Sequence, residues 1–166
     1  LGSGETAEEC EGAQVKVNMV LRRLPRLIDP STSSEAAFGG TFHVNESFSQ
    51  LETAFQAAKD GLIPSPIPCE IYCHSITDPS ILSPELADLG AHTLTVFGLQ
   101  TPHRLSGTMS PDLLRERLQE KVDASVNSVL SEPIQDLPPL WPVPPACHYA
   151  RYSPAPPDSY QLGHLG

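Results

Sequence analysis

Basic residues are scarce in this sequence: its 166 residues include 10 lysines and arginines against 20 aspartates and glutamates, which gives a net charge of −10. DNA- and RNA-binding modules neutralise phosphates with clustered lysines and arginines, so this balance argues against nucleic acid as a partner. The same acidity disfavours adhesion to anionic membranes.

Long hydrophobic runs are also missing. No apolar segment approaches the roughly 18 residues that indicate a membrane span, and the N-terminus lacks the basic-then-apolar layout of a signal peptide. Cysteine is limited to Cys10, Cys69, Cys73 and Cys147. Without a secretory signal, free thiols in a reducing compartment are expected rather than a disulfide framework. We therefore expect an intracellular protein without a membrane span.

Common catalytic signatures are absent. The sequence contains no P-loop, no G-x-S-x-G nucleophile elbow and no H-E-x-x-H zinc motif. The segment Gly2–Ala7 fits the loose dinucleotide pattern G-x-G-x-x-G/A, but that motif needs a strand before it and a helix after it. A single residue precedes the segment and acidic residues follow it, so we interpret the match as a coincidental loop.

The chain divides into three parts by composition. Residues 1–14 form an acidic N-terminal loop, and residues 15–131 have the apolar pattern of a folded region. Residues 132–166 hold nine of the 18 prolines. Because proline fixes φ and removes a backbone donor, we expect 132–166 to be a disordered Pro-rich tail. Its segment 140–145 has the composition of a polyproline ligand, which is also common without that role.

Four strands and two long helices are predicted in the middle region. Alternating and β-branched apolar residues predict strands over 15–22, 41–44, 69–75 and 92–99. Helices are expected to begin after Ser47 and at Ser110-Pro111, the second reaching about Ser131. The order strand, strand, helix, strand, strand, helix predicts an α+β fold, in which a mostly antiparallel mixed sheet is backed by helices.

The first helix has a well-marked start and an apolar stripe. Ser47 and Gln50 have the spacing of a capping box, and Gly61 suits the end of the helix. Apolar residues recur at helical spacing along one stripe, which is typical of a face turned toward a core. The stripe comprises Phe48, Leu51, Phe55, Ala58 and Leu62.

Cys69, Cys73 and His74 have a metal-like spacing. On a strand the two cysteines share a face but lie about 13 Å apart, at roughly 3.3 Å per residue. One zinc ion cannot bridge that separation. We therefore predict two buried cysteines and a histidine on the opposite, polar face.

The other histidines and the carboxylates of the second helix also lack a defined role. His43, His92 and His103 lie near strands or their ends, and the sequence does not place a nucleophile or a carboxylate beside them. We interpret them as structural histidines. Glu116 and Glu120 share a helix with several basic residues, which indicates a solvated face. We assign no catalytic, cofactor-binding or metal-binding residue from the sequence.

Three stretches carry a family resemblance. They are Val15–Leu27 (VKVNMVLRRLPRL), Gly39–Gly61 (GGTFHVNESFSQLETAFQAAKDG) and Pro68–Pro102 (PCEIYCHSITDPSILSPELADLGAHTLTVFGLQTP). The region resembles the phytoene desaturase-like FAD-dependent oxidoreductases. Within that group it resembles the branch named pyridine nucleotide-disulphide oxidoreductase domain-containing protein 2.

The resemblance implies a substrate-side domain, inserted in that family into a Rossmann domain that binds FAD. The two glycine-rich FAD signatures of the family lie outside the resembling region. We therefore expect a fragment, from a truncated or frameshifted gene, that holds no FAD alone. The full-length family would act on an apolar small molecule, and its animal members would be mitochondrial. Uncovered domain surface would favour self-association.

Two alternatives stay open at this point. The chain could be a non-catalytic binding module whose Pro-rich tail recruits a partner. It could also be a metal-dependent hydrolase that uses its histidines.

Overall fold

The computed structural model describes residues 13–137 and 149–151. These residues form one sheet with the strand order β2-β3-β4-β1-β5, in which every neighbouring pair is antiparallel. The strands are β1 (Gln14–Leu21), β2 (Phe42–Val44), β3 (Cys69–Tyr72), β4 (His92–Leu99) and β5 (Tyr149–Arg151). The predicted α+β fold, an antiparallel sheet backed by helices, is confirmed.

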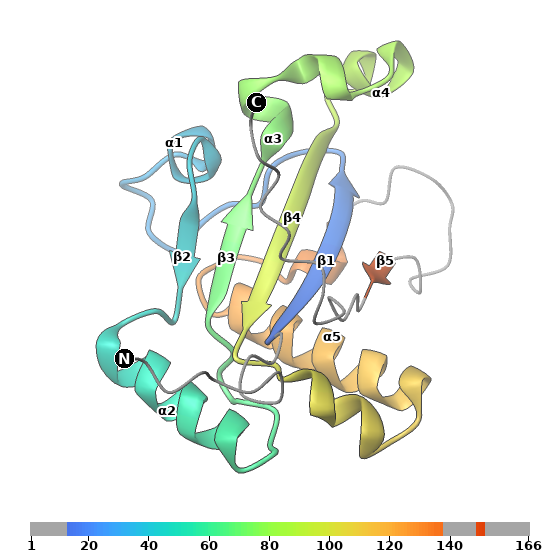
Figure 1. Cartoon of the computed structure of the whole chain (residues 1–166). Coiled ribbons are helices and arrows are strands. Elements are labelled where there is room, and N and C mark those ends of the chain that lie inside the picture. The colour runs from blue at the N-terminus through green and yellow to red at the C-terminus, as the bar shows by residue number, and fades with distance from the viewer. Residues whose placement is uncertain (1–12, 138–148, 152–166) are drawn as a thin grey trace, which may run out of the picture.

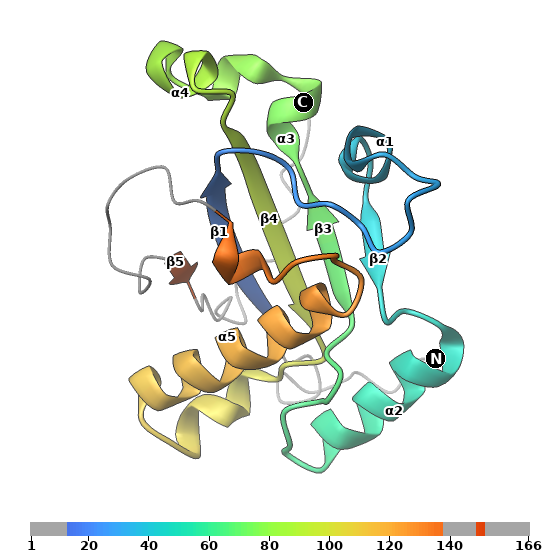
Figure 2. The same cartoon turned by 180° about the vertical axis from the view of Figure 1, so that it is seen from behind.

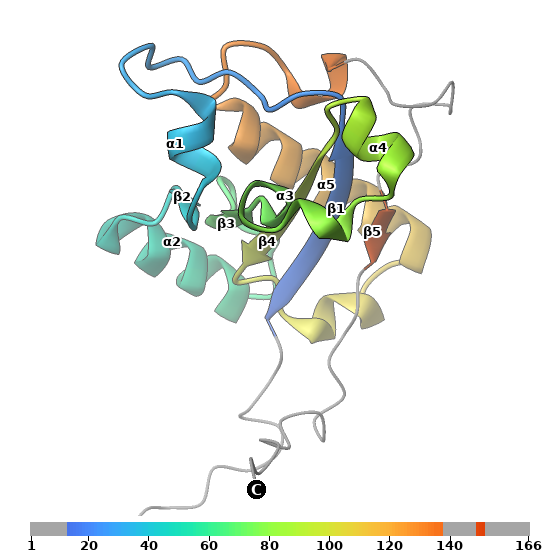
Figure 3. The same ribbon diagram turned by 90° about the horizontal axis from the view of Figure 1, so that it is seen from above.

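Short and long helices connect the strands. The α-helices are α1 (Ser34–Phe38), α2 (Phe48–Lys59), α3 (His74–Thr77), α4 (Pro84–Asp88) and α5 (Pro111–Asn127). Three 3₁₀ turns are η1 (Pro79–Ile81), η2 (His103–Gly107) and η3 (Ile134–Asp136). Helices α1 and α2 lie on the β2 side of the sheet, and β5 forms the opposite edge (Figure 1, Figure 3). No helix in the described ranges is long and apolar enough to cross a membrane.

Local capping chemistry sets the starts of the two long helices, as predicted. The Ser47 hydroxyl accepts from the Gln50 backbone N–H at 3.4 Å, and the Gln50 side chain accepts from the Ser47 N–H at 3.1 Å. Ser110 caps α5 by accepting from the Leu113 N–H. Gly61 follows α2 with φ of 76°, a left-handed conformation that suits glycine. Helix α5 ends four residues before the expected Ser131.

One face of the sheet is packed against α5. Alternate residues of β1 point into this core, and the register pairs Val17 with Val96 and Met19 with Leu94. Figure 2 shows α5 in front of the sheet on this side. The helix contributes a buried stripe at four-residue spacing: Leu114, Leu118, Val122 and Val126. The opposite face of the sheet carries no helix from the described part of the chain (Figure 1).

The expected core-facing stripe of α2 is wrong in part. The helix buries Ala54 and Ala58, whereas Phe48 is 86% exposed, Phe55 48% and Leu62 60%. At about 100° per residue, Phe48 and Phe55 lie roughly a quarter-turn away from the two alanines. The helix contacts the rest of the fold through small side chains, so the bulky apolar residues face outward. Periodicity identified a helix but not which side of it was buried.

The predicted boundary after Ser131 is also wrong. Ile134 is 1% exposed and Leu137 5%, so both belong to the core. Pro133 stands at the start of η3, where a missing N–H donor costs nothing, and the short segment Tyr149–Arg151 pairs with β1. The fold therefore extends at least to Leu137. The rest of the predicted tail and nearly all of the predicted N-terminal loop lie outside the described residues.

Candidate functional site

The face of the sheet opposite α5 carries a row of polar and aromatic side chains. Antiparallel register places Lys16 of β1 beside Phe97 of β4, Phe97 beside Glu70 of β3, and Glu70 beside His43 of β2. The Lys16 ammonium lies 5.3 Å from the centre of the Phe97 ring. Tyr72, also on this face, packs edge-on against Phe97 at 5.7 Å between ring centres. This face therefore offers an aromatic and charged platform rather than an apolar one.

A histidine and two glutamates meet at the β2 end of this platform, and we call His43, Glu46 and Glu70 the edge cluster. A ring nitrogen of His43 and one carboxylate oxygen from each glutamate lie within 4.8 Å of one another. Strand pairing brings His43 opposite Glu70. Asn45 adopts a left-handed φ of 59°, which turns the chain after β2 so that Glu46 reaches back to His43. His43 Nδ1 and Glu46 Oε2 are 2.7 Å apart.

Hydrogen bonds hold the two carboxylates of the edge cluster in place, but one of their buried oxygens has no hydrogen-bond partner among the described residues. The Tyr72 hydroxyl donates to Glu70 Oε2 at 2.8 Å. The hydrogen bond to Glu70 is the main cause that raises the pKa of the Tyr72 hydroxyl. The Glu46 side chain is 15% exposed, and its Oε1 is buried with no hydrogen-bond partner in the described ranges. A buried carboxylate oxygen without a hydrogen-bond partner is costly in free energy, and the neighbouring Asn45 Nδ2 is also without a partner among the described residues.

Cys69 lies beneath the edge cluster on the core side of β3. Burial, with a smaller contribution from the Glu46 charge, raises the pKa of the Cys69 thiol to about 12. The thiol therefore stays protonated near neutral pH and is a poor nucleophile. Cys69 and Cys73 are free and buried, as predicted. Strand β3 ends at Tyr72, three residues earlier than expected, and the exposed His74 begins α3.

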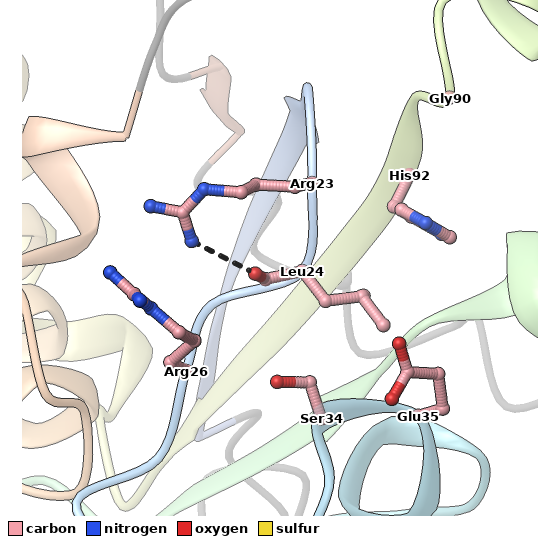
Figure 4. A pocket seen from close by; sticks show the side chains of 7 residues that line it. All are labelled: Arg23, Leu24, Arg26, Ser34, Glu35, Gly90 and His92. Atoms are coloured by element: carbon pink, nitrogen blue, oxygen red, sulfur yellow. Dashed lines mark hydrogen bonds between the residues drawn. The ribbon is translucent and has the colours of Figure 1, made fainter.

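A cavity, which we call the second hollow to distinguish it from the edge cluster, lies between the chain that follows β1, the start of α1 and the start of β4. This cavity of about 400 Å³ is lined by Arg23, Leu24, Arg26, Ser34, Glu35, Gly90 and His92. Figure 4 shows the two arginines on one side and Glu35 and His92 on the other. Nη2 of Arg23 donates to both oxygens of Glu132 at 2.7 Å, and Arg26 Nε donates to the same carboxylate at 3.3 Å. Glu132 and the cavity-lining Glu35 together match the charge of the two arginines, so the cavity has no excess positive charge with which to bind a free anion.

The remaining sequence candidates lie apart from the edge cluster. His92 borders the second hollow with its Nδ1 3.3 Å from the Ser75 hydroxyl, and His103 is on the exposed turn η2. Glu116 and Glu120 are exposed on α5, so the predicted solvated face is confirmed. The segment Gly2–Ala7 and residues 140–145 lie outside the described residues.

Sequence reasoning missed Glu46 and Glu70 as partners of His43. The H-x-x-E spacing of His43 and Glu46 was a local signal, because a turn after a short strand brings such residues together. Glu70 had no local signal, since its contact depends on the pairing of β2 with β3.

The comparisons with known proteins match most of this chain to part of longer relatives. It is 62% identical over 130 residues to the uncharacterized protein Rv0897c of Mycobacterium tuberculosis. It has the same identity, over the same length, to the uncharacterized protein Mb0921c of Mycobacterium bovis. Each match covers 78% of this chain but 24% of the relative, so the chain spans about a quarter of the length of these curated relatives. No family model and no solved structure matches the chain.

Proposed function

We propose that this chain is the substrate-side domain of an FAD-dependent oxidoreductase of the phytoene desaturase-like group, and that it is inactive alone. The complete enzyme would oxidise an apolar small molecule and pass its hydride or electrons to flavin. FAD supplies the redox chemistry in such enzymes, and the protein supplies binding and orientation.

The observation that carries the proposal is the way the three resembling stretches fold together. Val15–Leu27 contains all of β1 except Gln14, Gly39–Gly61 contains β2 and α2, and Pro68–Pro102 contains β3 and β4. These strands are adjacent in the order β2-β3-β4-β1. The three resembling stretches therefore supply four neighbouring strands of one sheet. This arrangement is expected if the stretches derive from a single domain, and it supports the proposed domain assignment.

The relatives support the proposal through their length. A match that covers 24% of a relative leaves most of that protein for other domains, with room for one that binds FAD. Among the described residues, no helix covers the sheet face opposite α5, and Phe48 and Phe55 of α2 are exposed, which would suit contact with such a domain.

The residues described here do not fit FAD themselves. A pyrophosphate cradle needs glycines between a strand and a helix. The turns from β2 to α2 and from β3 to α3 contain no glycine, and the first contains the acidic Glu46. Gly98 lies within β4, and a Cβ added there would meet Val15 at 2.7 Å, so its space is filled. FAD would therefore be held by another part of the longer protein.

The exposed apolar face of α2 suits contact with that other part. Phe48 and Phe55 lie seven residues apart on α2 and are 86% and 48% exposed, and Leu62, just after the helix, is 60% exposed. Large apolar side chains exposed on one helix face are typical of interaction surfaces. We propose that in the longer protein the FAD-binding domain covers this face, and that in the isolated chain the face promotes self-association.

The experiment compares the flavin content of the M. tuberculosis relative with that of this chain, and measures the molar mass of this chain in solution to detect self-association. The M. tuberculosis relative is expected to purify with near one FAD per chain, while this chain purifies without flavin and associates as its concentration rises. The double variant Phe48→Ser/Phe55→Ser should remain monomeric, whereas the control Glu52→Gln should associate like the parent. A relative that binds no FAD, or a parent chain that is monomeric at all concentrations, would contradict the proposal.

A further inference from the structure

We propose that the edge cluster of His43, Glu46 and Glu70 is a binding site for one divalent transition-metal ion, with Zn²⁺ as the best fit. The inference does not depend on the proposed function, because no flavin contact or substrate contact enters it. It rests on two independent observations, the convergence of three donor side chains and a buried carboxylate oxygen that no described residue satisfies.

The distances are close to those that a metal requires. Zinc binds imidazole nitrogen and carboxylate oxygen at about 2.0–2.2 Å, which separates tetrahedral ligands by about 3.4 Å. The three donor atoms lie within 4.8 Å of one another, and His43 Nδ1 is already 2.7 Å from Glu46 Oε2. Small side-chain rotations would therefore bring the donors into coordination, without movement of the paired strands that carry His43 and Glu70.

The charge of the cluster favours a cation. Two carboxylates face one imidazole, and in the described part of the chain the ion pairs of Glu46 and Glu70 include no lysine or arginine. No described residue donates a hydrogen bond to the buried Glu46 Oε1. A metal ion held by the Glu46 and Glu70 carboxylates would balance the charge of the cluster, which the single hydrogen bond between His43 and Glu46 Oε2 does not do completely.

Neighbouring groups already orient the donors. The Tyr72 hydroxyl donates to Glu70 Oε2, which fixes the carboxylate and leaves its other oxygen available. The turn that carries Glu46 is tied to α2 because Gln50 Nε2 donates to Asn45 Oδ1 at 3.2 Å. Outer hydrogen bonds of this kind are what set ligand orientation in metal sites.

The donor types select the class of metal. Calcium and magnesium prefer oxygen ligands, and calcium takes six to eight of them, whereas imidazole favours zinc and its neighbours. Three protein donors also leave a coordination position for water or another ligand, as open zinc sites do. We therefore expect Zn²⁺ to bind and Ca²⁺ to bind much more weakly.

The test is calorimetric titration of the full chain, free of any purification tag, with ZnCl₂ and in parallel with CaCl₂. A Cys10→Ser/Cys147→Ser background removes two thiols that could hold zinc elsewhere. We expect one Zn²⁺ per chain and at least about tenfold weaker binding in His43→Ala and in Glu70→Gln, a loss of about 1.4 kcal/mol or more. The matched controls His103→Ala and Glu116→Gln should bind like the background chain.

Two further measurements separate loss of the metal site from unfolding and from zinc binding by cysteine. Circular dichroism of each variant checks that the fold is intact, and the exposed His43 is expected to tolerate replacement. The absorption spectrum of the Co²⁺ complex should lack a thiolate charge-transfer band, since the proposed donors are nitrogen and oxygen. The proposal is overturned if the chain binds no Zn²⁺, if folded His43→Ala and Glu70→Gln bind as the background chain does, or if the Co²⁺ spectrum shows sulfur ligation.

Discussion

Arg23 and Glu132 are 109 residues apart in the sequence, yet one guanidinium nitrogen of Arg23 donates to both oxygens of the Glu132 carboxylate at 2.7 Å. The pair joins the chain that leaves β1 to the chain that follows α5. The backbone makes the same connection, because the Ser131 N–H donates to the Arg26 carbonyl at 2.9 Å. The segment just after α5 is therefore an integral part of the fold.

Removing the buried side chains of this segment should destabilise the protein. Ile134→Ala is expected to lower the free energy of unfolding by about 2–5 kcal/mol, since it leaves a cavity in a filled core. Urea denaturation measures the change. A chain that ends after Leu137 should keep more stability than one that ends after Ser131. Equal stability of these two truncated chains would show that residues 132–137 add nothing.

The Glu132 ion pair should make stability depend on pH. The hydrogen bond from Arg23 is the main cause that lowers the pKa of the Glu132 carboxyl below its ordinary value of 4.5. A lowered pKa in the folded state gives stability that is complete above the ordinary value and is lost as pH falls through the folded value. Glu132→Gln should thus destabilise the protein at pH 7 and converge with the parent in acid. Glu116→Gln, on the exposed face of α5, should show no such convergence, and a pH-independent effect of Glu132→Gln would contradict the assignment.

Gly98 should resist substitution because Val15 of β1 and Val122 of α5 approach it closely. A Cβ at position 98 would lie 2.7 Å from Val15 Cγ1 and 3.1 Å from Val122 Cγ2. Overpacking of this kind costs about 1–3 kcal/mol, so Gly98→Ala should lower the thermal midpoint clearly. Gly40→Ala serves as the control, since a Cβ at position 40 meets no atom within 4 Å. A Gly98→Ala protein as stable as the control would show that the side chains of Val15 and Val122 do not fill the space beside Gly98.

The Cys69 thiol should be inert in the folded protein. Burial raises its pKa to about 12, so almost none of it is thiolate at pH 8. In a Cys10→Ser/Cys73→Ser/Cys147→Ser background, which leaves Cys69 as the one thiol, a disulfide reagent should react with Cys69 at the rate at which the fold opens to expose it. Denaturant should increase that rate steeply. A fast, denaturant-independent reaction at Cys69 would mean that the thiol is accessible and its environment is not the one described.

Features that depend on neighbouring residues in the sequence were predictable. The capping pairs Ser47–Gln50 and Ser110–Leu113 act within one helical turn, so the sequence contains their whole cause. The alternation of apolar and polar residues in β1 likewise predicted which of its side chains lie on the same face of the sheet. The burial of Cys69 followed from the same reasoning.

Features that depend on packing were not predictable in the same way. The sequence shows an apolar stripe on α2 but not that the two alanines would face the fold, because that depends on where the helix docks. The edge cluster needed the pairing of His43 with Glu70 across two strands. Proline content suggested a tail from residue 132, yet a single well-placed apolar residue such as Ile134 can hold a proline-rich segment to a core.

The most direct test of the proposed domain role is a chimera. The 130-residue region of the M. tuberculosis relative that matches this chain at 62% identity is replaced by the corresponding residues of this chain, and the FAD content of the purified chimera is measured. We predict near one FAD per chain, as in the unmodified relative, and loss of FAD when Phe48→Ser and Phe55→Ser remove the apolar face of α2. A chimera that folds but binds no FAD while the relative does, or a relative without FAD, would contradict the assignment.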